Sequence, residues 1–231
     1  MLDDDLAVKL SELARSLREE NGAQETLDAI VSAAVGTVPG AQYAGLTVVR
    51  HRSALDTRAA TDEVVRQVDR AQYETGEGPC LDAALREERT VRMPDVTTEK
   101  RWPAFTRRAG GLGVRSMLSF RLYVQDDSLG ALNLYARDRD AFGDESEHVG
   151  QLFAAHAAVA LSGVRQEEDL ARAIAMRDLI GQAKGILMER HRVTADQAFT
   201  LLVRASQQTN TKLADIARRL VDTGELAGRG G

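Results

Sequence analysis

The chain has 231 residues, of which 43% are hydrophobic and 28% charged, a composition typical of a globular protein with one or two domains. Its single cysteine, Cys80, excludes an intramolecular disulfide and a cysteine-rich zinc site. No signal-peptide pattern and no apolar run of ~20 residues is present, so we expect a cytoplasmic protein without membrane contact. Residues 1–169 hold 20 Lys+Arg and 29 Asp+Glu, a net charge of −9, whereas residues 170–231 hold 10 and 6, a net charge of +4. A basic end behind an acidic body indicates an anionic partner for that end.

Residues 1–23 are predicted to form an N-terminal helix. Leu6, Leu10, Leu13 and Leu17 recur at spacings of four, three and four, which places them on one side of a helix. This narrow leucine stripe fits pairing with a partner helix, and it equally fits packing on the chain's own domain.

Residues 24–163 are predicted to form an α+β domain. A helix over 24–36 precedes a strand at Tyr43–Arg50, and two further strands, 114–124 and 129–135, are joined by a short connection that is typical of a hairpin. Helical stretches near 62–73, 80–88 and 103–109 lie between them, broken by glycine and proline. We therefore expect an antiparallel sheet flanked by helices, which pack on one of its faces.

A single helical pattern runs over about 145–191 and is far longer than an average helix. Its stretch at 165–169 is too polar to be buried, so residues 164–175 are predicted to be a helical linker between two domains. Two alternatives stay open: a two-stranded coiled coil in a dimer, or two helices with a break near Gly163.

Residues 176–226 are predicted to form an all-α domain of three helices, followed by a disordered tail at 227–231. Thr194 and Gln197 form a capping box, Thr211 is expected to cap the last helix, and Gly224 ends it. The apolar residues of the three helices lie on faces that can meet, and they are Ile180, Ala183, Leu187, Ala195, Ala198, Phe199, Leu202, Ala205, Leu213, Ile216, Ala217 and Leu220.

No catalytic constellation is present, and the four histidines are scattered without metal-ligand spacing. We therefore expect neither an enzyme nor a metal site nor a known cofactor. Cys80 follows the turn at 76–79 and begins a helix, where a thiol can have a lowered pKa and act in ligand or redox sensing. A buried structural thiol is the other role that this position allows, and it is the role we expect for Cys80.

A basic stripe is predicted on the first helix of the C-terminal domain. Arg177, Gly181, Lys184 and Met188 follow one another at helical spacing, and a glycine between two bases would let a nucleic-acid backbone approach closely. An ordinary solvated face gives the same pattern.

Further polar side chains accompany the stripe. Lys212 follows the polar turn at 207–210, and Arg204 lies on the polar face of the middle helix. Amides and hydroxyls beside bases suit the recognition of single-stranded RNA loops.

Several segments of the C-terminal domain form a specific pattern: Ile180–Met188 (IGQAKGILM), Ala198–Phe199, Arg204–Ser206 (RAS) and Asn210–Leu213 (NTKL). Together they resemble the ANTAR family of RNA-binding antitermination domains, and the resemblance covers about 170–225. The preceding Arg101–Pro103 (RWP), Gly113–Ser119 (GVRSMLS) and Leu129–Tyr135 (LGALNLY) resemble a GAF domain of the GAF–ANTAR regulators, over about 24–163.

The resemblance implies a transcription antitermination regulator that binds RNA stem-loops as a homodimer and is controlled by a GAF sensor with an unknown small-molecule ligand. The family pattern falls on Gly181, Ala183, Lys184, Gly185, Ala198, Arg204, Asn210, Lys212 and Leu213. Of these, Lys184, Arg204, Asn210 and Lys212 are the implied RNA contacts, to which the stripe adds Arg177.

Two departures from related proteins limit what the resemblance implies. Nothing here is similar to the acidic pocket of a phosphorylated receiver domain, and the cyclic-nucleotide pattern of some GAF domains is absent around Asn133 and Phe142. A DNA-binding regulator of the helix-turn-helix kind is the alternative, since three short helices also describe that motif. A GAF enzyme such as a methionine sulfoxide reductase is disfavoured, because one cysteine cannot supply an attacking and a resolving pair.

Overall fold

A computed structural model describes residues 22–50, 54–86, 88–125 and 127–226. The leucine stripe expected in residues 1–23 and the tail expected at 227–231 lie outside the described residues, apart from the last two positions of the first range. The chain divides into two compact units, one ending at Arg165 and the other beginning at Gln166. The elements in chain order are α2 (Ala23–Thr37), β1 (Tyr43–Arg50), β2 (Ala54–Ala60), α3 (Glu63–Thr75), α4 (Pro79–Leu85), β3 (Thr90–Met93), α5 (Pro103–Ala109), β4 (Ser116–Val124), β5 (Asp127–Ala136), α6 (Asp144–His191), α7 (Ala195–Thr209) and α8 (Leu213–Thr223).

The first unit is built on a five-stranded antiparallel sheet with the order β2-β1-β5-β4-β3. The predicted first strand is confirmed as β1 and the predicted hairpin as β4–β5, in which Ser119 lies opposite Asn133. The sequence did not indicate β2 and β3. β2 carries Asp56 and Arg58, and β3 has only four residues, so neither shows a long β-forming run. Both are edge strands, where short and charged segments are common.

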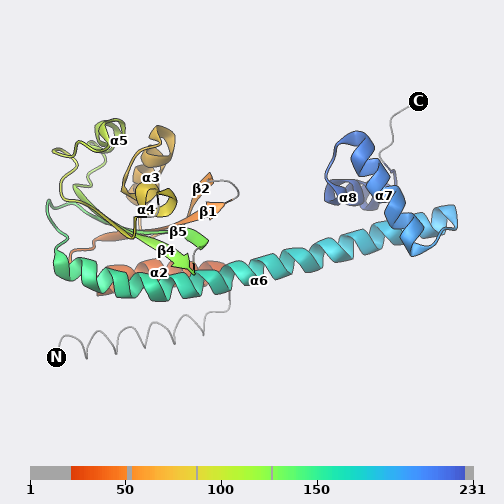
Figure 1. Ribbon diagram of the computed structural model, residues 1–231, viewed down its shortest axis with the longest axis horizontal. Helices are drawn as coiled ribbons and strands as arrows, with labels where there is room; N and C mark the ends of the chain where they lie inside the picture. The colour runs from red at the N-terminus through yellow and green to blue at the C-terminus, as the bar shows by residue number, and fades with distance from the viewer. Residues whose placement is uncertain (1–21, 51–53, 87, 126, 227–231) are drawn as a thin grey trace. The chain divides into compact units, whose positions relative to one another are not determined.

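Helices cover both faces of the sheet: α2 and the beginning of α6 lie on one face, and α3, α4 and α5 lie on the other (Figure 1). The expectation that helices pack on only one face is therefore wrong. The physical reason is visible in β5, which is buried at every position from Leu129 to Ala136. A strand covered on both faces shows a continuous apolar run instead of alternation. The fold class, an antiparallel sheet flanked by helices, is confirmed.

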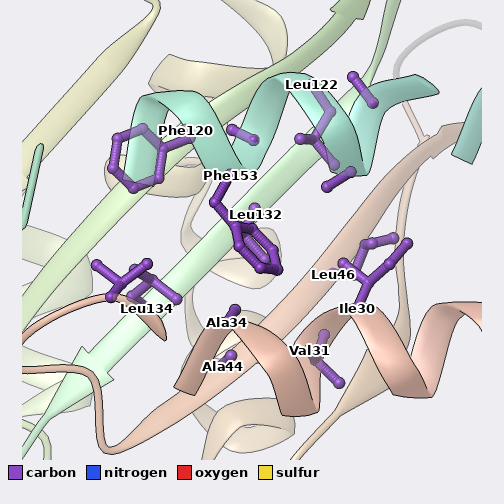
Figure 2. Close-up of a cluster of buried hydrophobic side chains, with 14 of the residues drawn as sticks. Ile30, Val31, Ala34, Ala44, Leu46, Phe120, Leu122, Leu132, Leu134 and Phe153 are labelled. Atoms are coloured by element: carbon purple, nitrogen blue, oxygen red, sulfur yellow. The ribbon is translucent and has the colours of Figure 1, made fainter. Parts of the chain in front are cut away.

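The larger core lies between the sheet and the helices α2 and α6. Figure 2 shows Phe153 of α6 pointing from the helix toward the sheet, in the same buried cluster as Leu132 of β5 and Ile30 of α2. These three side chains are fully buried. Burying each such side chain stabilises the fold by ~1.5–3 kcal/mol. This layer therefore holds the beginning of α6 against the sheet.

α6 is one uninterrupted helix of 48 residues, which excludes the break considered near Gly163. Its beginning is buried against the sheet through residues such as Phe153 and Leu161. From Gln166 to Asp178 none of its side chains is buried. The helix therefore has the solvated middle that the sequence indicated.

The second unit is a three-helix domain made from the end of α6 with α7 and α8. Its core consists of Ala183, Leu187, Ala198, Leu202, Ala205, Ile216, Ala217 and Leu220. The capping box at Thr194 and Gln197 is confirmed, and Gly224 ends α8 in the left-handed region with φ 73°. Two expectations are wrong: Phe199 is 40% exposed instead of belonging to the core, and the N-cap of α8 is Lys212, without a side-chain hydrogen bond, instead of Thr211.

Gly150 sets how closely α6 approaches the sheet. A Cβ at this position would overlap the ring of Phe120, whose side chain is itself fully packed. Gly150→Ala should therefore lower the free energy of unfolding by ~1–3 kcal/mol, because the ring or the helix must shift. Urea unfolding of the full chain measures the change.

Gly163→Ala is the matched control in the same helix. A Cβ there would meet no described atom within 4 Å. Replacing a helical glycine in open space should raise the free energy of unfolding by up to ~1 kcal/mol. The packing account is contradicted if both substitutions change stability in the same direction by similar amounts.

Candidate nucleic-acid surface and buried polar cluster

The basic stripe predicted on α6 does form one face of the helix. Arg177, Gly181, Lys184 and Met188 are separated by four, three and four residues in an uninterrupted helix, which brings them to the same side. Lys184 is half-buried and the other three are exposed. The stripe therefore borders the core of the second unit without entering it.

Gly181 and Gly185 leave the backbone of α6 bare at this face. Both lie inside the helix, and a Cβ at either position would meet no described atom within 4 Å. A glycine in a helix interior costs ~1 kcal/mol relative to alanine. Packing among the described residues does not account for this cost, so these positions suit the close approach of another molecule.

Asn210 and Lys212 lie together in the turn between α7 and α8. Asn210 adopts the left-handed conformation with φ 51°, and its N–H donates to the Ser206 carbonyl. The Ser206 hydroxyl in turn donates to the Thr211 carbonyl at 2.6 Å, which holds the turn closed. Asparagine tolerates this backbone region better than most residues, so Asn210 has a structural role beside any contact of its exposed amide.

Arg204 lies on the exposed side of α7, away from the buried row that includes Leu202. The structure thus brings Arg177 and Lys184 to one helix face and Asn210 and Lys212 to one turn. Among the described residues, none of the cations Arg177, Lys184, Arg204 and Lys212 forms an ion pair. Their charges are not neutralised within the second unit and are available to an anionic partner.

Sequence reasoning missed one exposed side chain of this unit, Phe199 on α7. Helical spacing placed Phe199 beside Ala198 and Leu202, and periodicity alone does not distinguish the edge of an apolar face from its centre. The exposed pair Arg218 and Arg219 of α8 adds further positive charge.

A group of hydrogen-bonded polar side chains lies in the first unit, on the sheet face covered by α3 and α4. Its centre is Asp69 of α3, which is fully buried. Asp69 accepts hydrogen bonds from the hydroxyl of Thr57 at 2.8 Å, from the hydroxyl of Tyr135 and from the side-chain amide of Gln72 at 3.3 Å. Burial raises the pKa of Asp69 to about 6, against the lowering effect of these hydrogen bonds and of Arg66.

Hydrogen bonds continue from Asp69 across the sheet. The Tyr73 hydroxyl lies 2.8 Å from the Thr57 hydroxyl and 2.8 Å from the Thr47 hydroxyl. Thr47 accepts from the Asn133 amide at 3.1 Å and from the Cys80 thiol at 3.4 Å. This polar cluster connects residues of α3, α4, β1, β2 and β5.

Cys80 belongs to this cluster and is fully buried. It follows Pro79 at the start of α4, and its backbone N–H donates to the Gln72 side chain at 2.9 Å. Burial, followed by the negative charge of Asp69, raises the pKa of Cys80 to about 12. A redox-reactive thiol has a lowered pKa and solvent access, so the surroundings of Cys80 favour the structural alternative.

No sequence motif pointed to Asp69. A weak indication exists, because Asp69 shares the helical spacing of Val65, Val68 and Gln72, which form the buried face of α3.

Among the described residues, no three His, Cys, Asp or Glu side chains are grouped as a metal site. No helix in the described part of the chain combines the length and apolarity needed to span a membrane.

The pKa of Asp69 predicts a pH-dependent stability. Its folded-state pKa of about 6 lies above the value of 3.8 expected without burial. Between these values the folded chain holds a proton that the unfolded chain has lost, so stability falls as pH rises. Relative to Asp69→Asn, the unfolding free energy of the wild type should fall by about 2–2.5 kcal/mol between pH 4 and pH 7. Denaturant unfolding across this range measures it, and parallel curves would refute the assignment.

Solved structures similar to the chain share the fold of the first unit. The GAF domain of a phosphoenolpyruvate-protein phosphotransferase from Coxiella burnetii is 17% identical, with a TM-score of 0.56, over 71% of this chain and 96% of that chain. A type II free methionine-R-sulfoxide reductase from Thermoplasma acidophilum is 20% identical, with a TM-score of 0.51, over 62% and 94%. A domain of a putative two-component sensor histidine kinase protein from Sinorhizobium meliloti is 16% identical, with a TM-score of 0.54, over 66% and 99%.

These identities show a common fold and nothing about activity. A comparison with curated proteins found no match. Family models are more specific: a GAF domain matches residues 20–162, and an ANTAR domain matches residues 168–221. The two matches fall on the two structural units in this order, so the chain belongs to the GAF domain family and has the GAF–ANTAR architecture, a sensor domain followed by a regulatory domain.

Proposed function

We propose that this chain is a cytoplasmic transcription antitermination regulator whose ANTAR unit binds stem-loop RNA under the control of its GAF unit. The observation that carries the proposal is the ANTAR match over residues 168–221, which spans all three helices of the second unit. The cations Lys184, Arg204 and Lys212 form no ion pair with any described residue, and this supports an anionic partner. The proposed roles are sensing for the GAF unit and RNA binding for the ANTAR unit, without catalysis.

The proposed contacts divide into two kinds. Lys184 and Lys212, together with Arg177, carry charges on flexible stems and bind the phosphate backbone. Arg204 and Asn210 offer the guanidinium and amide groups that recognise exposed bases in a loop. The phosphate contacts position the RNA, and the base contacts select it.

The face of α6 that carries the basic stripe is also proposed to continue into a dimer contact. Leu170 and Ile174 lie on the same side as Arg177, at spacings of four and three, and are 63% and 53% exposed. Apolar residues at alternating spacings of four and three form the contact line of a coiled coil. A second copy of the chain covering this line would give the homodimer that the family architecture implies.

The lysine contacts predict a change in salt dependence. Lys184→Ala and Lys212→Ala should each weaken binding to an RNA hairpin that the protein has selected from a randomised pool. Each lost phosphate contact should reduce the slope of log affinity against log salt by ~0.7–0.9. Fluorescence anisotropy at several salt concentrations measures affinity and slope together.

Arg172→Ala is the matched control for charge. Arg172 is exposed on the same helix, pairs with Asp169 at 2.7 Å, and lies off the basic stripe. Its loss should leave the salt slope unchanged. If both lysine variants bind the selected hairpin as tightly as wild type while their helical circular dichroism is intact, the proposed surface is wrong.

Asn210 requires a substitution that spares the turn. Asn210→Gly keeps the left-handed backbone at φ 51° and removes the side chain with its amide, whereas Asn210→Ala would add backbone strain. The glycine variant should lose ~1–3 kcal/mol of binding to the selected hairpin, by analogy with base readout. A hairpin with a scrambled loop on the same stem should show no such loss, and equal losses on both hairpins would assign Asn210 to the turn alone.

The dimer has its own test. Light scattering of the full chain at micromolar concentration should give twice the mass of 25.1 kDa. Replacing Leu170 and Ile174 by serine should shift the mass toward the monomer, because two exposed apolar side chains leave the contact line. A monomeric wild type, or a double variant that stays fully dimeric, would place the contact elsewhere or remove it.

A further inference from the structure

The hydrogen bonds around Asp69 have a direction that its charge determines. An ionised carboxylate only accepts hydrogen bonds, so the Thr57 hydroxyl must donate its one proton to Asp69. Thr57 can then only accept from Tyr73, and Tyr73 can then only accept from Thr47. Every hydroxyl in this series of hydrogen bonds therefore donates its proton in the direction of Asp69.

The donors and acceptors at the Thr47 end of this series of hydrogen bonds are determined in the same way. Since Thr47 donates to Tyr73, its oxygen accepts from the Asn133 amide nitrogen and from the Cys80 thiol. The Asn133 amide oxygen is fully buried and has no hydrogen-bond partner among the described residues. A buried carbonyl without a hydrogen-bond partner is unfavourable, and the ionised state of the cluster leaves this one without a donor.

We propose that this cluster is a proton-operated relay. Uptake of one proton by Asp69 reverses the direction in which the hydroxyls of Thr57, Tyr73 and Thr47 donate their hydrogen bonds. This reversal in turn rotates the side-chain amide of Asn133. The proton binds the carboxylate oxygen that faces Thr57, and the other oxygen continues to accept from Tyr135 and Gln72.

Each hydroxyl then rotates its own proton to the next partner. Protonated Asp69 donates to Thr57, Thr57 donates to Tyr73, and Tyr73 donates to Thr47. The Thr47 proton needs a new acceptor, and turning the Asn133 amide supplies the oxygen that had no partner. One proton enters from solvent, no other group changes charge, and no covalent bond other than the new O–H is made.

One acceptor gains a partner in this arrangement. The Asn133 amide oxygen, which has no partner among the described residues, accepts from Thr47 once the amide has turned.

The surroundings restrict the relay to one titrating group. Asp69 interacts electrostatically with Arg66 and Tyr73 of its own helix. Tyr135 of β5 and Cys80 of α4 are the titratable groups that face it from other elements. The strands β1 and β2 contribute the uncharged hydroxyls of Thr47 and Thr57. Burial raises the pKa values of both tyrosines and of Cys80, so these groups stay neutral. The pKa of Asp69, about 6, places the change between mildly acidic and neutral pH.

Nuclear magnetic resonance of the labelled full chain tests the relay without requiring RNA. The Asp69 carboxyl carbon and the Asn133 side-chain amide should shift with the same midpoint between pH 4.5 and pH 7.5. Asp69→Asn should abolish both titrations. A wild-type Asn133 signal that stays constant while Asp69 titrates would overturn the proposal.

Tyr73→Phe removes the middle hydroxyl and should separate the two groups: Asp69 still titrates, and the Asn133 amide no longer follows. Tyr43→Phe is the matched control, because Tyr43 contacts Arg137 through its ring and its hydroxyl takes no part in the relay. If Tyr73→Phe does not fold, Thr57→Val breaks the preceding link and carries the same expectation. An Asn133 amide that follows Asp69 in a folded variant lacking its link also contradicts the relay.

Discussion

α6 contributes side chains to two separate hydrophobic cores. Phe153 and Leu161 fill the layer between the sheet and α2, and Ala183 and Leu187 fill the centre of the three-helix unit. Between these regions the helix is solvated from Gln166 to Asp178. Each unit uses its own part of this helix to complete its core, so the packing of α6 is the interaction that the rest of the structure depends on.

The same helix explains why the proposed binding face takes its position. Ala183 and Leu187 anchor one side of α6 in the core, and this leaves Lys184 at its border and Gly181 and Gly185 towards solvent. The bare glycine backbone carries a cost that packing within the described residues does not offset. An interaction with another molecule at this face would account for retaining two glycines there.

Long helices, the hairpin and the three-helix unit were predictable, because each depends on periodicity, capping or turn chemistry within one segment. The capping box at Thr194 and the run at Leu129–Tyr135 are such local patterns. β2 was not predictable, since its pairing with β1 depends on a neighbour and not on an apolar run of its own. The covering of both sheet faces was not predictable, because it depends on which helices pack onto the sheet and not on a pattern within one segment.

The candidate functional residues likewise divide into a group that local sequence patterns predict and a group that they do not. The cations of the ANTAR unit follow from helical spacing and from segments such as Ile180–Met188, whereas the Asp69 cluster joins five elements that are distant in sequence. No single segment shows that Thr57, Tyr73 and Thr47 would align between a carboxylate and an amide. No cation among the described residues pairs directly with Asp69, so burial is unfavourable for its ionised form and dominates its pKa.

The central claim is that the ANTAR unit recognises RNA, and its most direct measurement is a competition on the full-length protein at one fixed salt concentration. An RNA hairpin selected by the protein and a DNA duplex of the same stem sequence are titrated against each other. The account predicts that the hairpin displaces the duplex, because exposed loop bases and the RNA backbone are the recognised features. A duplex DNA that displaces the hairpin would contradict the account and would identify the three helices as a DNA-binding unit.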